Sequence, residues 1–573
     1  MWDRGVGYYD VYNKKWNQIS GIQLGHYSWF TSMDVDKGGN AWVGTVIDGF
    51  YVIDMHNFSV TRTLDIPLLS GNTVRNGIQS IYCDRENNSV WIGLYNQGMC
   101  YYHPSMNKIV LYNKKMINGD WKGEEIRCML ETSKGEILMG TTQGVYRYEP
   151  ETKSMNRFYH EFSQKNCRVL YEDSKKRVWV GTYHDGLYCI DHGKVQSYDY
   201  PDTDYQNELD FSNIRVMVED SSGRLWVSIY GGVGLFNPEN GQINLLSEQF
   251  PELKKYKVAN ALAIDNQSRL VVGSDNGLYI YDPATNKIWI PEEDGQANSI
   301  FNQGSIKYNQ ILKDHEGTLW FATQYGLSVL TYNGQSYTLG KEEGLSKAIL
   351  NVVEDKNHDI WISTVTSIYK IKVDRRADKY SFHVISCLSE DEIRQDDLYS
   401  FPSLMTRDNQ LFLGLMNGFI AFSPENMIDN QCLNRPLFTS FRLFNVPVVS
   451  GEIYNGRVLF DKALSYSDEV QLKYDENYIT LEFSGLNFPN PSQTSFRYQL
   501  EGFDKEWTET LFENGQGRVV YNNLPSGEYI FRVSAAGNDR IWGPESAFKI
   551  VIHPPFWDTP VSYTHLRAHE TAA

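Results

Sequence analysis

Residues Val169–Asp191 read VLYEDSKKRVWVGTYHDGLYCID, a stretch that decides the fold of most of the chain. A short apolar segment ends in the acidic pair Glu172-Asp173 and is followed by a polar turn. A second segment contains Trp179, and a turn around His184 leads to a third apolar segment. β-Branched and aromatic residues alternate within these segments, and turn-forming residues stand at both bends. The pattern predicts an antiparallel β-meander.

The same phrase occurs nine times along the chain, at spacings of 41 to 51 residues. Aligned on the position of Trp179, the other copies are centred on Trp42, Trp91, Leu138, Trp226, Val271, Trp320, Trp361 and Phe412. A period of this length fits one four-stranded blade of a β-propeller, with the fourth strand supplied by segments such as Lys194–Tyr198 and Gln242–Leu246. Helical repeats of similar length are excluded, because Gly interrupts every copy and no window keeps a 3.6-residue period. We therefore predict an all-β chain.

The copies divide into two sets. Residues 126–430 contain seven copies, which is enough for one closed, seven-bladed propeller. Residues 1–125 contain two copies preceded by an orphan strand pair, so we expect a partial preceding propeller of about two and a half blades whose beginning is missing. The last copy lacks an obvious fourth strand, which either Lys108–Tyr112 or Phe438–Phe444 could supply to close the ring.

The repeat stops after Arg435-Pro436, and a different kind of strand pattern follows. Short alternating segments such as YITLEFSGLNF and GEYIFRVSAAG, separated by Pro and Gly turns, predict an immunoglobulin-like β-sandwich over residues 431–556. Residues 557–573 end in the polar segment VSYTHLRAHETAA, which we expect to be a disordered and partly non-native tail.

Composition excludes several functions. The formal net charge is −18 and no basic stripe is present, so a nucleic-acid partner is not expected. The seven cysteines show neither CxxC nor metal-ligand spacing and are expected to be buried thiols. No apolar run is long enough to span a membrane. No metal or cofactor is predicted, because His184, His315 and His358 lie in turns without paired-histidine spacing.

Acidic pairs precede the first turn of several copies, at Glu172-Asp173, Glu219-Asp220 and Glu354-Asp355. Two neighbouring carboxylates can perform acid and base catalysis. However, a catalytic pair is needed once, whereas an aspartate that caps a turn is needed in every blade. The repetition therefore favours a structural role for these pairs.

Meander geometry identifies candidate ligand contacts. The turns between the second and third strands open on the same face as the links between blades. On this face lie Tyr95, Tyr183, His184, Asp185, Tyr230, Asp275, Gln324 and Tyr325, together with Gln143, Asn276, Met416 and Asn417. Aromatic rings stack on the apolar face of a sugar, while carboxylates and amides bind its hydroxyl groups. The alternative is that these are ordinary polar turn residues.

The blade phrase resembles the two-component regulator propeller repeat, D-x-x-G-x-[LI]-W-[IV]-G-T-x-x-G-[LI]-x-x-[YF]. The segment around Tyr498, Tyr521 and Tyr529, together with the closing PPFWDTP, resembles the three-tyrosine (YYY) domain. Two propellers followed by this sandwich form the periplasmic sensor region of hybrid two-component systems, and the resemblance covers about residues 5–560. The family has about fourteen repeats, whereas this chain has nine and a half, so we expect a sensor region truncated at both ends.

The resemblance implies a periplasmic sensor that binds an oligosaccharide and dimerises through the sandwich. It also implies a signal peptide before the chain, and a membrane helix and a histidine kinase after it. This part of the protein would not itself be an enzyme. Tyr498, Tyr521, Tyr529 and Trp507 are expected to be core and corner aromatics that keep the sandwich rigid. The alternative function is a propeller-fold polysaccharide lyase or glycosidase, for which we identify no unrepeated catalytic group.

Overall fold

The computed structural model describes most of residues 6–555. The residues left out within this span are 23, 25, 64–76, 86–87, 96–97, 104–109, 201–208, 292–305, 342, 346, 377–378, 389–401, 428–434, 489–490, 492–493, 512–514 and 538–540. The expected tail at residues 557–573 lies outside the described residues. Almost all regular structure in the described part is β-strand, which confirms the predicted all-β class.

The helical elements are short. They are α1 (Leu246–Gln249) and the 3-10 turns η1 (His160–Phe162), η2 (Pro251–Lys255), η3 (Pro424–Asn426) and η4 (Leu464–Tyr466). None of the helices in the described part of the chain has the length and apolar character needed to cross a membrane.

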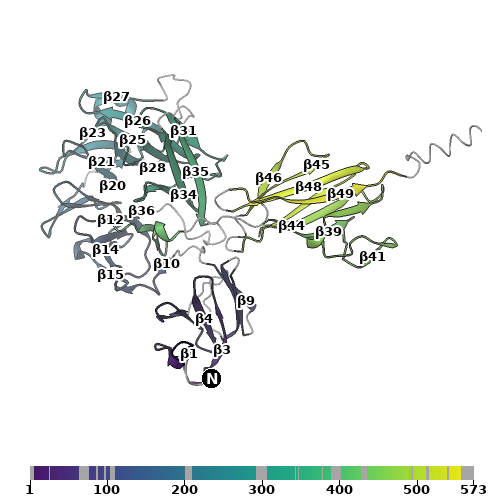
Figure 1. The fold of residues 1–573 in the computed structure, drawn as a ribbon. Coiled ribbons are helices and arrows are strands. Elements are labelled where there is room, and N and C mark those ends of the chain that lie inside the picture. The colour runs from purple at the N-terminus through teal and green to yellow at the C-terminus, as the bar shows by residue number, and fades with distance from the viewer. Residues whose placement is uncertain are drawn as a thin grey trace, which may run out of the picture. The chain divides into compact units, whose positions relative to one another are not determined.

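Asn107–Met427 forms one compact unit made of seven β-sheets, whose main strands are antiparallel (Figure 1). The first sheet contains β12 (Ile126–Glu131), β13 (Ile137–Thr141), β14 (Gly144–Glu149) and β15 (Ser154–Arg157). The second contains β16 (Cys167–Glu172), β17 (Val178–Thr182), β18 (Leu187–Asp191) and β19 (Lys194–Tyr198). The third contains β20 (Asp210–Glu219), β21 (Leu225–Tyr230), β22 (Gly232–Phe236) and β23 (Ile243–Leu245). The fourth sheet contains β24 (Ala259–Ile264), β25 (Leu270–Ser274), β26 (Gly277–Asp282) and β27 (Lys287–Trp289). The fifth contains β28 (Tyr308–Lys313), β29 (Leu319–Thr323), β30 (Gly326–Leu330) and β31 (Ser336–Leu339). The sixth contains β32 (Asn351–Glu354), β33 (Ile360–Ser363), β34 (Ile368–Arg376) and β35 (Lys379–Leu388).

The seventh sheet joins the two ends of this unit. It contains β36 (Ser403–Met405), β37 (Leu411–Leu415), β38 (Gly418–Phe422) and, as its fourth strand, β10 (Val110–Asn113). The strand β10 pairs antiparallel with β38, from Val110 opposite Ala421 to Asn113 opposite Gly418. A further short strand, β11 (Asn118–Gly119), pairs in parallel with β15. Because β10 and β11 belong to the ring, it begins earlier than the boundary predicted at residue 126.

The sheets close into a ring. Their first strands contact one another in the cyclic order β12, β16, β20, β24, β28, β32 and β36, and β36 contacts β12. Each interface between neighbouring sheets has its own cluster of buried apolar residues. At the interface between the last and first sheets, Phe412 and Phe419 pack with Met129 and Tyr146. The ring is therefore held together by burial between sheets as well as by one shared strand.

A buried aspartate organises the turn between the first two strands of a sheet. The Oδ1 atom of Asp173 accepts hydrogen bonds from the backbone N–H groups of Lys175 (3.0 Å) and Arg177 (2.9 Å). Its Oδ2 atom accepts one from the indole N–H of Trp179 (2.9 Å) and one from the Arg177 guanidinium (2.7 Å). The same aspartate–tryptophan bond, 2.8 to 3.0 Å long, joins Asp36 to Trp42, Asp220 to Trp226, Asp314 to Trp320 and Asp355 to Trp361.

The glutamates of the acidic pairs connect neighbouring sheets. Glu172 accepts hydrogen bonds from the backbone N–H (2.6 Å) and hydroxyl (2.8 Å) of Ser133 in the preceding sheet. Glu219 binds Ser174 in the same way. Glu131 accepts the backbone N–H of Arg407 (2.8 Å) and thereby bridges the last and first sheets. Both members of the acidic pairs therefore have structural contacts, in agreement with the sequence interpretation.

The residues before the ring form three sheets, of two, four and three strands. They are β1 (Gly7–Asp10) with β2 (Lys15–Gln18); β3 (Phe30–Val35), β4 (Asn40–Thr45), β5 (Phe50–Asp54) and β6 (Val60–Thr63); and β7 (Ile78–Asp84), β8 (Ser89–Leu94) and β9 (Gly98–Tyr102). The cysteines follow the prediction where they are described: six are free and buried, and Cys432 lies outside the described residues.

The residues after the ring form a sandwich of two main sheets. One contains β40 (Val446–Pro447), β39 (Leu437–Leu443), β44 (Ile479–Ser484) and β47 (Gln516–Tyr521). The other contains β43 (Glu469–Leu472), β49 (Ser546–Ile552), β48 (Gly527–Ala536), β45 (Ser495–Glu501) and β46 (Thr508–Leu511), and a small hairpin consists of β41 (Ile453–Tyr454) and β42 (Arg457–Val458). The segment Phe438–Phe444, the other candidate for closing the ring, therefore lies largely in β39 of the sandwich and pairs with β44.

The predicted core aromatics of the sandwich have different environments. The buried Tyr521 donates its hydroxyl to Asp504 (2.8 Å), and the buried Tyr529 donates its hydroxyl to the carbonyl of Pro525 (2.8 Å). Tyr498 is half-buried and packs against Phe531. The prediction for Trp507 is wrong: this ring is 36% exposed and stacks with the guanidinium of Arg497 on the outside of β45.

We predict that Asp173→Ala lowers the free energy of unfolding of the ring by about 3 kcal/mol. The substitution leaves the buried Trp179 indole and two backbone N–H groups of the turn without their acceptor. Urea unfolding followed by tryptophan fluorescence measures the change. The matched control is Asp191→Ala at the exposed end of β18, and an equal effect of the two substitutions would contradict the prediction.

A second prediction concerns acid stability. Burial raises the pKa of Asp220, but hydrogen bonds from Trp226, Arg224 and Ser222 outweigh this effect, so the pKa is lowered. A carboxylate with a lowered folded-state pKa stabilises the protein above its unfolded pKa of about 4, and this contribution is lost as the pH falls through the folded value. We expect unfolding free energy to decrease below about pH 5, and to decrease less in Asp220→Asn. Unfolding curves between neutral pH and acid pH test this, with Asp191→Asn as the control.

Candidate ligand-binding site

The first strands of five ring sheets share a β-bulge at the same position. The register shifts lie between Ile126 and Cys128, Cys167 and Val169, Ile214 and Val216, Ala259 and Ala261, and Tyr308 and Gln310. The residues left out of the ladder are Arg127, Arg168, Arg215, Asn260 and Asn309. A bulge leaves one residue unpaired and redirects its side chain. Three arginines and two asparagines are therefore presented by neighbouring strands at the centre of the ring.

The three arginines differ in their partners. Arg127 forms an ion pair with Glu125 (2.8 Å), and Arg215 donates to the Oδ1 atom of Asn260 (2.8 Å). The guanidinium of Arg168 lies over the ring of Tyr183, 4.3 Å from its centre. Within the described part of the chain, no carboxylate or hydrogen-bond acceptor binds Arg168.

Burial and neighbouring charges shift the pKa values of Arg168 and Arg215. Burial, followed by the positive charges of Arg215 and Arg127, lowers the pKa of Arg168 to about 10, so the group is still protonated at neutral pH. Burial also lowers the pKa of Arg215, although Asp275, Tyr183 and Tyr230 act in the opposite direction. A partly buried guanidinium whose pKa is lowered by two neighbouring arginines is a favourable site for an anion, which would replace the missing counter-charge.

A depression adjoins the turn that carries Tyr183. Its volume is about 660 Å³, and it is lined by Lys165, His184, Asp185, Tyr188, Ser197, Asp199, Tyr200 and Ser212. The rings of Tyr183 and His184 lie 3.9 Å apart, centre to centre. Asp185 forms an ion pair with Lys165 (3.1 Å), and His184 lies 3.5 Å from the buried carboxylate of Asp210. Aromatic rings, charges and hydroxyl groups therefore line one opening.

The structure brings several of the predicted residues to this region. Tyr183 contacts Arg168, while His184 and Asp185 line the depression. Tyr230 and Asp275 lie close enough to Arg215 to affect its pKa. Asp275 also accepts a hydrogen bond from Asn260 (2.6 Å) and pairs with Lys307 (3.3 Å), so it helps to orient the neighbour of Arg215.

Three predicted residues are not brought together with the arginines. Gln324 and Tyr325 occupy the turn after β29, where Tyr325 is 64% exposed. Tyr95 follows β8, outside the unit that forms the ring, and is 58% exposed. Nothing in the described contacts joins these three side chains to Arg127, Arg168 or Arg215.

Sequence reasoning missed the arginines. The sequence does carry an arginine at the same place in three successive copies of the repeat: EEIRCMLE, KNCRVLYE and SNIRVMVE. Each arginine stands within a strand, where alternation alone predicts a side chain that packs between sheets. The bulge changes this direction, and the strand pattern gives no indication of a bulge.

Comparison with known proteins agrees with this architecture. Residues 487–553 match the Y_Y_Y domain family. A stretch of 211 residues, 37% of the chain, is 21% identical to histidine kinase P4 of Formosa agariphila and covers 14% of that protein's length. The chain also matches the crystal structure of the extracellular domain of the putative hybrid two-component system BT3049 from B. thetaiotaomicron, with a TM-score of 0.69 and 20% identity, over 96% of this chain and 70% of that one.

The three matches support different parts of the sequence interpretation. The Y_Y_Y match lies within the sandwich. The match to the histidine kinase rests on sequence identity over part of the chain, and the structural match shows a shared fold over nearly the whole chain. Together they agree with the resemblance of this chain to the sensor regions of hybrid two-component systems.

Proposed function

We propose that this chain is the ligand-sensing, extracytoplasmic region of a hybrid two-component sensor kinase, and that its ligand is an acidic carbohydrate fragment bound at the arginine site. The observation that carries the proposal is Arg168: it is partly buried, stacked on Tyr183, placed near two further arginines and without a carboxylate partner among the described residues.

The chemistry of the site fits an acidic sugar. A carboxylate or sulfate group can accept paired hydrogen bonds from a guanidinium, which is the geometry that arginine binds best. Tyr183 and His184 offer aromatic surface for the apolar face of a sugar ring. The adjoining depression offers Lys165, Asp185 and Ser212 for hydroxyl groups. In this proposal Asp275 orients Asn260, the partner of Arg215, and Tyr230 lies near Arg215. Gln324, Tyr325 and Tyr95 are not assigned to the arginine site.

Signal relay is the second part of the proposal. The resemblance places a membrane helix directly after the sandwich, so a signal from the ring would cross the Y_Y_Y domain in a periplasmic homodimer. A ligand shifts such an equilibrium only through its different affinity for the two arrangements. The sandwich can transmit a displacement because its core is well packed, with Tyr521 and the Leu500 N–H both bonded to one carboxylate oxygen of Asp504.

The ligand class is tested by calorimetry on the whole chain. We expect binding of uronic-acid or sulfated oligosaccharides and no binding of neutral oligosaccharides of the same linkage; comparison of the two acidic sets identifies the anionic group. Arg168→Gln should weaken binding at least tenfold, which corresponds to about 1.4 kcal/mol. The control is Arg147→Gln, an exposed arginine of β14 paired with Glu136.

Two results would overturn the ligand proposal: equal binding of neutral oligosaccharides, or unchanged affinity in Arg168→Gln. Chromatography of the oligosaccharide after incubation tests the alternative function. Shortened products that disappear with Arg168→Gln would favour a lyase or glycosidase over a sensor.

The relay is tested in the full-length protein with Tyr521→Ala. We expect activation of the target genes to fall at least fivefold while ligand affinity of the purified chain changes less than twofold, because the substitution lies in the sandwich. Tyr521→Phe, which removes only the hydrogen bond to Asp504, should have a smaller effect. Circular dichroism shows whether each variant is folded, and normal activation by a folded Tyr521→Ala variant would rule out the sandwich as the transmitter.

A further inference from the structure

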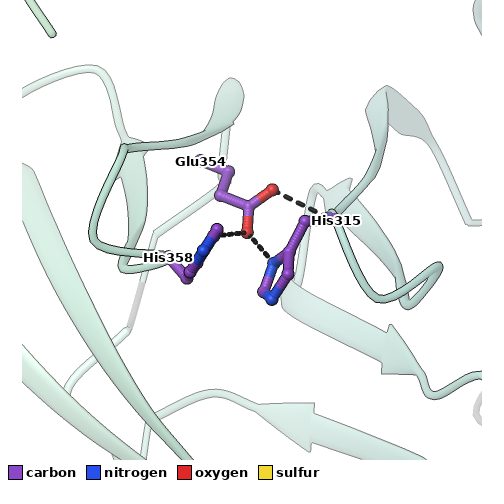
Figure 2. A group of neighbouring side chains, drawn as sticks. All are labelled: His315, Glu354 and His358. Atoms are coloured by element: carbon purple, nitrogen blue, oxygen red, sulfur yellow. Dashed lines mark hydrogen bonds and ion pairs between the residues drawn. The ribbon is translucent and has the colours of Figure 1, made fainter.

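Two histidines and a glutamate converge on the turns between the first and second strands of two neighbouring ring sheets (Figure 2). His315 follows β28, Glu354 ends β32, and His358 lies in the turn after β32. The Nδ1 atom of His358 lies 3.1 Å from the Oε1 atom of Glu354, and the Nδ1 atom of His315 contacts the same oxygen. The two imidazole rings are stacked, with their centres 3.5 Å apart.

The fold does not require imidazole at either position. His315 occupies the place of Ser133 and Ser174, whose small side chains make the same contact with a glutamate of the next sheet. His358 occupies the fourth position of its turn and has a positive φ of 64°. The equivalent residues with positive φ are Gly135, Lys176, Gly223, Ser268, Gly317 and Asn409. Gly, Ser, Lys and Asn therefore serve at the turn position that His358 fills.

We propose that His315, Glu354 and His358 form a binding site for a divalent transition-metal ion such as Zn²⁺. Imidazole nitrogen and carboxylate oxygen are the ligands that zinc takes in proteins. The three ligand atoms lie within 4.8 Å of one another, and both Nδ1 atoms face one carboxylate oxygen. Tetrahedral zinc with bonds of about 2.0–2.2 Å places neighbouring ligand atoms about 3.3–3.6 Å apart, so both Nδ1 atoms must move slightly away from the Glu354 oxygen to admit the ion.

The surroundings support this arrangement. The other oxygen of Glu354 accepts the backbone N–H of His315 (2.9 Å), and this bond orients the carboxylate. Arg375 binds the backbone carbonyl of His358 through both terminal nitrogens (3.3 and 3.4 Å) and thereby holds the turn. The side chains of both histidines are partly exposed, so solvent can complete the coordination. A bound ion would cross-link two sheets of the ring through side chains alone.

The test is zinc binding by the whole chain after treatment with a chelator. Calorimetry with ZnCl₂ should show one saturable site per chain, and Zn²⁺ should raise the melting temperature. His315→Ser and His358→Asn should each weaken zinc binding at least tenfold and abolish the increase in melting temperature. These replacements are drawn from equivalent turns of the same ring, so the variants should fold, and circular dichroism checks this.

The matched control is His192→Asn, which removes another exposed histidine that has a positive φ and a carboxylate neighbour, Asp191. It should bind zinc as the unmodified chain does. Absence of saturable binding would overturn the proposal and leave a hydrogen-bonded contact between sheets. Equal binding by folded His315→Ser and His358→Asn variants, or an equal loss in His192→Asn, would also overturn it.

Discussion

The ring depends on a carboxylate buried beneath each of several turns and bonded to the indole of a tryptophan on the next strand. Asp173 is only 2% exposed, and a charge at such a position is tolerated only when its oxygen atoms are fully hydrogen-bonded. Where the tryptophan is replaced by Leu138 or Phe412, the aspartate is replaced by Thr132 or Thr406, which cap the same turn through a hydroxyl. Turn and core therefore vary together in these two sheets, whereas the sheet that carries Val271 in place of the tryptophan keeps the buried aspartate as Asp265.

Much of the fold follows from the sequence because each sheet repeats this unit. The strands, the turns and the change to a sandwich after Arg435-Pro436 were predictable from local patterns. The strand that closes the ring was predictable only as one of two candidates, Lys108–Tyr112 and Phe438–Phe444, because β10 carries no repeat signature and is distinguished only by its pairing with β38. The exposure of Trp507 was also missed, since an aromatic residue in a strand pattern is consistent with either a core position or a stacked position on the surface.

The candidate site was predictable only in part. Meander geometry placed Tyr183, His184 and Asp185 on one turn, which in the structure adjoins the depression, because turn positions follow directly from strand order. The bulges that redirect Arg127, Arg168 and Arg215 depend on how each first strand pairs with its neighbour. The meeting of His315 and His358 depends on contact between different repeats, which linear spacing does not encode. The residues that share one turn could therefore be predicted from the sequence, whereas contacts between residues of different sheets could not.

The closing strand also has a consequence for biogenesis. Val110–Asn113 leaves the ribosome before the first sheet, but its partner Gly418–Phe422 follows only after roughly 300 residues. At about 5–20 residues per second, translation separates the two by about 15–60 seconds. During that time the edge of β10 has no native partner and is open to mispairing with another nascent chain. The ring is therefore expected to need chaperone protection until nearly its whole length has been translated.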